Sequence, residues 1–390
     1  GAALALASIG LEVALLDAAP APTPGAPYDG RAYSTPTGSR NFWRALGVWD
    51  RVEGDAQEIS DILVTDGRVG EGAASLFLHL DHRDPAGGGF GAMVEDRRLR
   101  PAVYAALAEA PGTTIRREAR AVSTREGPGR RIAVLESGEE ISARLILAAD
   151  GRESPLRKAA GIERLSWSYG QNGLVSAVAH ELPHQGFAHE FFLPAGPFAI
   201  LPLRGNRASL VWTESRAEAA RIHALPDDLY LAELESRFGD FLGALTLEGG
   251  RWTYPLNFSL AHEYVRPRLA LLGDAAHAVH PIAGQGLNLG LRDAAALADV
   301  LAEAMRRGED IGDLAVLARY QQWRRFDNAA LGLSMDALNR LFSNDIGPVR
   351  AIRDFGLALV NRAPFAKRAF MRAASGLSGE APRLMRGERA

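Results

Sequence analysis

The residues best suited to bind a ligand follow an apolar run, Leu-Ala-Leu-Leu, in the last third of the chain. Gly273 and Asp274 come directly after this run, which predicts a buried strand that ends in a carboxylate. A loop with Pro281 and Gly284 follows, and we expect a helix to begin near Gly286. Glycines clustered at a helix start cost stability unless the backbone must approach a ligand closely. The segment therefore predicts a binding site.

The chemistry of this site suits an electron-rich ring. Asp274 would accept hydrogen bonds from ribose or ribityl hydroxyls. The backbone N–H groups of Gly286, Leu287 and Asn288 would lie at the positive end of the helix dipole, which favours an anionic ligand. A flavin fits because reduction places negative charge on its pyrimidine edge, at N1 and the C2 carbonyl.

The same segment has plainer interpretations. The glycines would form only a flexible loop, with Arg292 and Asp293 as an ion pair on the helix surface. His277 and His280 have a spacing that suggests a metal, but they lie in a loop without a cysteine or a third ligand. We therefore expect no metal site, and a structural hydrogen bond for either histidine.

A second carboxylate, Asp150, also follows a buried apolar run and precedes a helical turn. With Gly151 and Arg152 it would suit a close approach by a ligand. The alternative is a simple strand-to-helix turn, with Ser154 as the N-cap and Pro155 at the first helical position.

The first residues predict the second half of a dinucleotide-binding βαβ unit. An alanine-rich helix closes at Gly10, and a strand over 11–17 ends in Asp17. Gly1 would be the last glycine of G-x-G-x-x-G, and Asp17 would hold ribose hydroxyls. The first strand and the first two glycines would be missing. The alternative is an ordinary helix and strand. In the loop that follows, Arg31 would contact a pyrophosphate or a flavin, or else be solvated.

Composition excludes several function classes. The chain has 390 residues, which favours two domains, and a net charge of −3 gives no electrostatic case for nucleic acid. It has no cysteine, which excludes disulfides, thiolate metal sites and iron–sulfur clusters and is typical of a reducing compartment. No apolar run reaches the roughly 20 residues of a membrane span. We expect a cytoplasmic protein.

The order of elements predicts an α/β fold with a Rossmann-like domain and a second, mainly antiparallel β-sheet domain. The expected boundaries are 1–68, 92–165 and 266–330 for the first domain, 69–91 and 166–265 for the second, 331–374 for C-terminal helices and 375–390 for a disordered basic tail.

Together these motifs resemble the ubiquinone-biosynthesis hydroxylases, the 2-polyprenylphenol and 2-polyprenyl-6-methoxyphenol hydroxylases among the class A flavoprotein aromatic monooxygenases. The resemblance covers nearly the whole chain, and residues 273–293 match the signature of that subfamily almost residue for residue. The expected departure from the pattern is at the front, where the opening strand and the first two glycines would be missing. Further similar segments are 169–172, 192–203, 210–213, 341–343 and 353–357.

The resemblance implies an FAD-binding domain like that of p-hydroxybenzoate hydroxylase. NADPH or NADH would reduce FAD, O₂ would add to the reduced flavin, and the hydroperoxide would hydroxylate the ring of a polyprenylated phenol. Since the cofactor carries the reactive oxygen, we expect no catalytic acid–base side chain. The FAD-binding candidates are Gly1, Asp17, Arg31, Asp150, Gly273, Asp274, Pro281, Gly284, Gly286, Leu287 and Asn288.

The resemblance also implies where the substrate lies. The backbone of His280 and Pro281 would position the substrate hydroxyl beside the flavin. The pocket would lie between the two domains, with Phe191, Phe192 and Leu201 as lining residues. The alternative for these three is ordinary sheet core.

Other functions stay open at this point. The same fold would suit a soluble aromatic-compound hydroxylase or a flavin-dependent reductase of isoprenoid chains, and a non-catalytic scaffold of a biosynthetic complex is a further alternative. Residues 349–372 mix apolar and basic side chains. A helix there would either lie on the inner face of a membrane or, as we favour, pack on its own domain.

Overall fold

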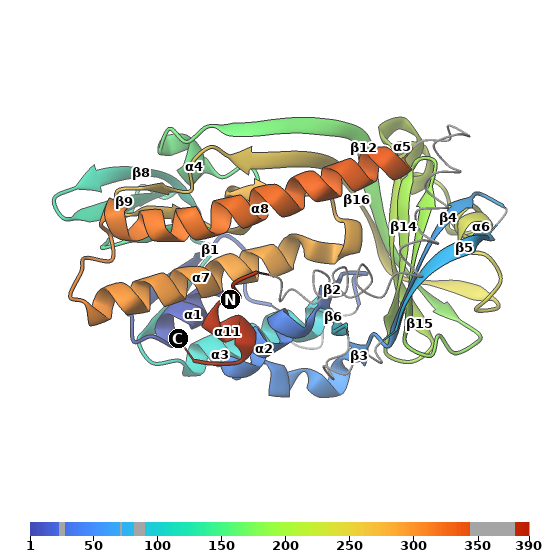
Figure 1. Ribbon diagram of the computed structural model, residues 1–390, viewed down its shortest axis with the longest axis horizontal. Helices are drawn as coiled ribbons and strands as arrows, with labels where there is room; N and C mark the ends of the chain where they lie inside the picture. The colour runs from blue at the N-terminus through green and yellow to red at the C-terminus, as the bar shows by residue number, and fades with distance from the viewer. Residues whose placement is uncertain (23–27, 71, 82–89, 344–378, 390) are drawn as a thin grey trace.

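The computed structural model describes residues 1–22, 28–70, 72–81, 90–343 and 379–389. Its elements form two parts that lie side by side along the long axis (Figure 1). The first part contains small sheets covered by helices, and the second contains one large sheet. The longest helix, α8 (Leu314–Phe342), runs across both parts.

The first part is built around short parallel strands. β18 (Leu269–Leu271) is buried at every residue and pairs with β11 (Ile146–Ala148), and β1 (Val13–Asp17) pairs with β7 (Thr113–Arg117). Continuous apolar strands of this kind occur where helices cover a sheet on both faces. The helices that pack here are α1 (Ala2–Ala7), α3 (Asp96–Glu109) and α7 (Gln285–Arg306).

Smaller elements complete this part. Residues 121–143 form a three-stranded antiparallel meander, and Ser154 accepts a hydrogen bond from the N–H of Arg157 as the predicted N-cap. The remaining strands are β2 (Ala32–Thr35), β3 (Gln57–Glu58), β6 (Ala92–Glu95), β8 (Ala121–Gly127), β9 (Arg130–Leu135), β10 (Glu140–Ala143) and β17 (Val265–Arg266). The remaining helical segments are α2 (Thr37–Ala45), η1 (Trp49–Arg51), η2 (Glu53–Asp55), α4 (Pro155–Ala159), η3 (Gly273–Ala275) and η4 (Ile282–Gly284).

The second part is an eight-stranded sheet in the order β19-β16-β12-β15-β14-β13-β4-β5. Every neighbouring pair is antiparallel except β13 with β4. Helices α5 (Arg216–His223) and α6 (Asp227–Phe238) cover one face around Trp212, and the other face turns toward the first part. The strands are β4 (Asp61–Arg68), β5 (Gly72–Asp81), β12 (Arg164–His180), β13 (Phe187–Leu193), β14 (Gly196–Leu203), β15 (Arg207–Ser215), β16 (Leu245–Ala261) and β19 (His277–Ala278).

This architecture confirms the expected α/β fold with a second, mainly antiparallel sheet. Two expected boundaries are wrong. A boundary at residue 68 would separate β4 from β5, but these strands pair with each other in the large sheet, so both belong to the second part. A boundary at residue 330 would cut α8, which continues to Phe342.

The expectation of a disordered tail is also wrong for residues 379–389. Here α11 (Arg383–Arg386) packs against the first part, with Leu384 and Met385 buried. The side-chain amide of Asn41 donates to the carbonyl of Met385, and Asp299 accepts from the N–H of Arg383. Apolar burial therefore anchors this end. The expected helices within 344–378, including the basic segment over 349–372, lie outside the described residues.

One buried carboxylate joins the loop before α7 to the two longest helices. The side chain of Asp293 is fully buried. Its Oδ2 accepts from the N–H of Gly273 at 3.1 Å and pairs with Nε2 of His277 at 2.6 Å. Its Oδ1 accepts from Nε of Arg324 at 2.9 Å and from Nδ2 of Asn328 at 3.1 Å. The loop is thus tied to both α7 and α8.

This finding corrects the interpretation of Arg292 and Asp293 as a surface ion pair. Asp293 points inward, and the guanidinium of Arg292 lies 3.3 Å from Asp327 instead. Burial by itself would raise the pKa of Asp293, but His277 and Arg324 lower it well below its ordinary value.

We predict that Asp293→Asn destabilises the fold by about 3 kcal/mol, because it leaves the buried guanidinium of Arg324 without its one fully buried charge partner among the described residues. Urea unfolding at neutral pH measures this loss. Because the folded-state pKa of Asp293 is lowered, its contribution is present above about pH 4, the ordinary range of an aspartate, and is lost as pH falls below it. The gap between wild type and variant should therefore narrow in acid.

A matched control is Asp327→Asn, which removes a partly exposed carboxylate that also pairs with Arg324. It should cost less than about 1 kcal/mol, as partly solvated ion pairs do. Equal losses for the two variants would contradict the central role of Asp293.

Candidate functional site

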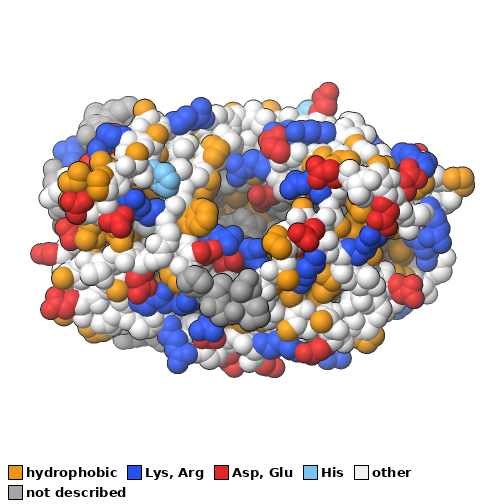
Figure 2. Space-filling view, turned by 180° about the vertical axis from the view of Figure 1, so that it is seen from behind, with side chains coloured by type: hydrophobic (Ala, Val, Ile, Leu, Met, Phe, Trp, Pro, Cys, Tyr) orange, Lys and Arg blue, Asp and Glu red, His pale blue; other side chains and the backbone are white. Residues whose placement is uncertain are grey.

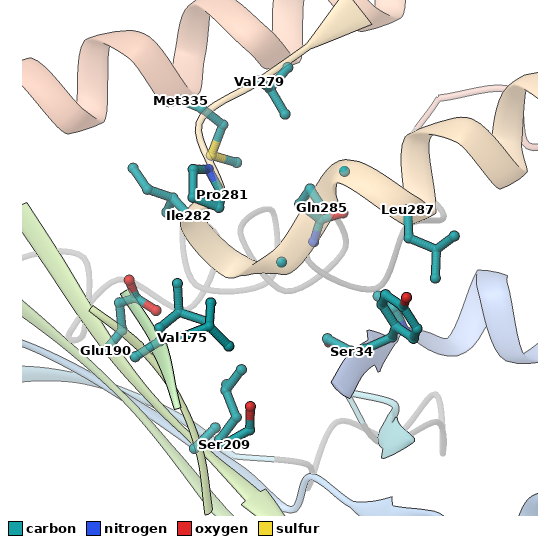
Figure 3. Close-up of a pocket in the computed structure, with 18 of the residues that line it drawn as sticks. Ser34, Val175, Glu190, Ser209, Val279, Pro281, Ile282, Gln285, Leu287 and Met335 are labelled. Atoms are coloured by element: carbon teal, nitrogen blue, oxygen red, sulfur yellow. The ribbon is translucent and has the colours of Figure 1, made fainter. Parts of the chain in front are cut away.

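A cavity of about 460 Å³ lies where the loop before α7 faces the large sheet. Figure 2 shows the face behind that of Figure 1, which is hollowed between the two parts. In Figure 3 the turn of Pro281 and Ile282 lies on one side, and Val175, Glu190 and Ser209 point toward it from the sheet. Cavities of several hundred Å³ between domains are common small-molecule sites.

One wall of this cavity, the loop wall, is formed by Asp274, Pro281, Ile282 and the first turn of α7. Before α7 stands Gly284, whose φ of 62° lies in the left-handed region that glycine adopts without strain. Among the described residues no side chain caps the helix, so its first N–H groups lack a side-chain acceptor. Gly286 and Leu287 line the cavity, and a Cβ on Gly286 would meet no atom within 4 Å. An electron-rich ligand would be stabilised there.

Asn288 holds this first turn in place. Its Nδ2 donates to the carbonyls of Ser34 and Gly284, each at 3.1 Å, and its Oδ1 accepts from the hydroxyl of Ser39 at 2.8 Å. The side chain is therefore committed to the protein. Asn288 does not line the cavity, and a contact between its backbone and a ligand stays a prediction.

Asp274 lies in η3, directly after β18, and lines the cavity. Its side chain is exposed and makes no hydrogen bond or ion pair within the described part of the chain. The neighbouring Gly273 does not line the cavity, and its N–H donates to Asp293. The carboxylate of Asp274 is thus available to accept hydrogen bonds from ligand hydroxyls.

Pro281 lines the cavity, whereas the side chain of His280 does not. His280 is fully buried beside the loop, edge-on to the ring of Tyr169 with centroids 5.1 Å apart. Burial lowers the pKa of His280 to about 4, so the ring is neutral at neutral pH. The predicted structural hydrogen bond is made by His277, with Asp293. A role in substrate positioning stays a prediction for the backbone at 280–281.

Arg31 lines the cavity but already has partners. Its guanidinium lies 2.5 Å from the carboxylate of Asp29 and 3.3 Å from that of Asp96, and it also sits over the ring of Trp252. Two carboxylates therefore hold it at the edge of the cavity, and contact with a ligand stays a prediction.

Three further candidates lie away from this cavity. Asp17 ends β1 and accepts from the N–H of Ala19 and the hydroxyl of Tyr104. Asp150 accepts from the N–H of Leu156 at 3.1 Å and so helps to begin α4. Gly1 precedes α1. A dinucleotide extends far beyond its ring, so the roles of these residues at the other end of a cofactor stay predictions.

The large sheet forms the opposite wall of the cavity, the sheet wall, which contains two of the three predicted lining residues. Phe192 and Leu201 line the cavity, and the ring of Phe192 also packs on Phe342. Phe191 does not, because neighbouring residues of a strand point to opposite faces. It packs in the core behind the sheet, near Phe198.

Sequence reasoning missed Glu190, which lines the cavity from the same strand. The period of two that places Phe192 on this face also places Glu190 there, so the signal was available. It also missed Met335 and Leu338 of α8, which lie far along the chain. No local pattern could have brought these two to the site.

These observations fit a flavin. Within the described part of the chain, the cavity offers a helix N-terminus without a side-chain cap, glycines that leave the backbone open, and a carboxylate without a partner just after a strand. Such groups match the electron-rich edge of the ring and the hydroxyls of its side chain.

Comparison with known proteins agrees with this geometry. The family described as "FAD binding domain" matches residues 1–329. The chain is 46% identical to the ubiquinone hydroxylase UbiL of Rhodospirillum rubrum, over 99% of this chain and 89% of that protein. It is 36% identical to the 3-demethoxyubiquinol 3-hydroxylase of Escherichia coli, over 96% and 95% of the two chains.

A solved structure shows the same fold at low sequence identity. The p-nitrophenol 4-monooxygenase PnpA of Pseudomonas putida superposes with a TM-score of 0.77 at 19% identity, over 97% of this chain and 95% of that chain. The family match, the two relatives and the shared fold agree with the site built from the loop and the sheet. The chain belongs to the FAD-binding monooxygenases, in the family of the ubiquinone-biosynthesis hydroxylases.

Proposed function

We propose that this protein hydroxylates the aromatic ring of a polyprenylated phenol in ubiquinone biosynthesis, with FAD as cofactor and with NADPH or NADH and O₂ as co-substrates. The relatives named for ubiquinone hydroxylation support the reaction. The observation that carries the proposal is that two chemically different surfaces face each other across one cavity. One surface is the N-terminus of α7 together with Asp274, and the other is a largely aliphatic face of the large sheet.

FAD, when bound, supplies the activation of O₂. The chain itself binds, orients and excludes water. Asp274 accepts hydrogen bonds from the ribityl hydroxyls, and the N–H groups at the start of α7 stabilise negative charge on the ring edge. Pro281 and Ile282 place the backbone of the loop beside the part of the cavity where the substrate ring would lie.

The sheet wall suits the apolar part of the substrate. An uncharged isoprenoid chain gains about 0.8 kcal/mol for each methylene that leaves water. A wall of branched side chains also keeps water from the reacting centre. The aliphatic residues on this wall include Ile62, Val64, Leu78, Leu80, Val175 and Leu201.

We predict that Asp274→Ala weakens FAD binding roughly 10- to 100-fold, since a hydrogen bond to a charged group contributes about 1.5–3 kcal/mol. Titration of the flavin-free protein with FAD measures the change. The melting temperature without FAD should stay the same, because Asp274 has no partner among the described residues.

The control is Asp240→Ala, which removes an exposed aspartate just beyond α6. It should leave the affinity for FAD unchanged. Full FAD affinity in Asp274→Ala would remove this residue from the site.

Oxygen labelling tests the reaction itself. With ¹⁸O₂ and a nicotinamide donor, the FAD-loaded protein should add one labelled oxygen atom to the ring of a prenylated phenol, as mass spectrometry of the product would show. The same phenol without its isoprenoid chain should be a poorer substrate, because less apolar surface is buried. Consumption of the nicotinamide with a reduced isoprenoid and no label would favour a reductase instead.

Peripheral attachment to the membrane that holds such a substrate stays a prediction. No helix in the described ranges is both long and apolar enough to span a bilayer. The basic segment over 349–372 lies outside those ranges. If it binds anionic lipid, the full chain should sediment with phosphatidylglycerol vesicles and a variant without residues 349–372 should not. Equal sedimentation of the two would argue against attachment through this segment.

A further inference from the structure

Glu190 is the one acidic side chain that the large sheet contributes to the cavity among the described residues. On β13 it stands opposite Val64 of β4 and Ala199 of β14. The same row continues through Val211 of β15 to Val175 of β12. Residues directly opposite each other point to one face of a sheet, and all five line the cavity. A carboxyl therefore interrupts an apolar row.

This carboxyl has no partner among the residues that the structure describes. It makes no hydrogen bond or ion pair with any residue that the structure describes. Burial raises the pKa of Glu190 to about 8, so the group is uncharged at neutral pH. A neutral carboxyl can both donate and accept a hydrogen bond, and it can share a dry cavity with an uncharged ligand.

Packing gives no reason for an acid at this position. The neighbours in the row are valine and alanine, so a branched apolar side chain would suit the wall better. Leaving a polar group without a partner in such a place costs free energy. That cost is recovered when a ligand supplies the missing hydrogen bond.

The direction of the side chain identifies the place of that bond. In Figure 3 Glu190 points from the sheet toward the turn of Pro281 and Ile282. A group held by Glu190 would therefore lie between the sheet and the loop wall, beside the N-terminus of α7. Ser209 is a second polar side chain on this wall, but it lies on another strand, further from the turn.

We propose that Glu190 recognises the substrate by accepting a hydrogen bond from the hydroxyl on its aromatic ring, and so orients the ring at the loop of Pro281. This inference rests on the proposed function, because it concerns the phenol of the same site. Glu190 is then a specificity-determining residue: it selects rings that carry an O–H group and sets which ring carbon faces the loop.

The test compares two substitutions. Glu190→Leu keeps the volume and removes the hydrogen bond, whereas Glu190→Gln keeps a neutral acceptor. Binding of 2-geranylphenol and of its methyl ether, which has no O–H, is measured by calorimetry on the FAD-loaded proteins. Wild type should bind the phenol about tenfold more tightly than the ether, the difference of one hydrogen bond. Glu190→Leu should bind both alike, and Glu190→Gln should keep most of the preference.

Two controls separate recognition from damage. Glu235→Gln removes an exposed acid of α6, behind the sheet, and should leave the preference for the phenol at about tenfold. Glu190→Leu should melt no lower than wild type, because it removes a polar group that stands in an apolar row and has no partner among the described residues. If Glu190→Leu folds and still prefers the phenol about tenfold, or if wild type shows no preference, the inference is overturned.

The inference and the proposed function fail in different ways. A preference for the phenol that depends on Glu190, without labelled product from ¹⁸O₂, would leave the recognition intact and refute the hydroxylase. Labelled product with equal phenol binding by wild type and Glu190→Leu would confirm the hydroxylase and refute the role of Glu190.

Discussion

The buried carboxylate of Asp293 is the contact on which the geometry of the site depends. Two donors from the loop before α7 and two from α8 meet on the two oxygens of this carboxylate, which α7 itself carries. Because an ion in the interior is stable only with its partners in place, the loop cannot shift without exposing an unpaired charge. Gly273 and His277 are both bound to Asp293, and they flank Asp274. The loop thus presents its carboxylate and the α7 amides in one fixed arrangement.

The cavity combines two environments that no single element could supply. The loop wall carries backbone dipoles and a carboxylate, and the sheet wall carries branched apolar side chains. In a space of low polarity the dipoles of α7 act more strongly on a ring edge than they would in water. Glu190 is an acidic residue within the apolar row of the sheet wall. Its neutral form is consistent with a wall that binds an uncharged molecule.

The parts of the site that depend on local backbone geometry could be predicted from the chain alone. The cluster of Gly284 and Gly286 predicted a helix N-terminus, and α7 begins at Gln285. The N-cap of α4 at Ser154 followed from its residue type and the proline after it. Contacts between distant segments could not be predicted in this way. The sequence offered a surface ion pair of Arg292 and Asp293 only as the plainer interpretation, whereas Arg324, far along the chain, balances the charge of Asp293 in the interior.

The sequence by itself determined the nucleotide-type loop, the α/β class and the family, because these follow from spacings of glycine, proline and apolar residues within short segments. Only the tertiary structure decided which strands form the substrate wall. β4 and β5 come from within the first quarter of the chain, yet they pair beside β13 in the large sheet. Strand pairing between distant segments depends on burial across the whole domain, and local periodicity shows only that a strand exists, not which neighbour it will have.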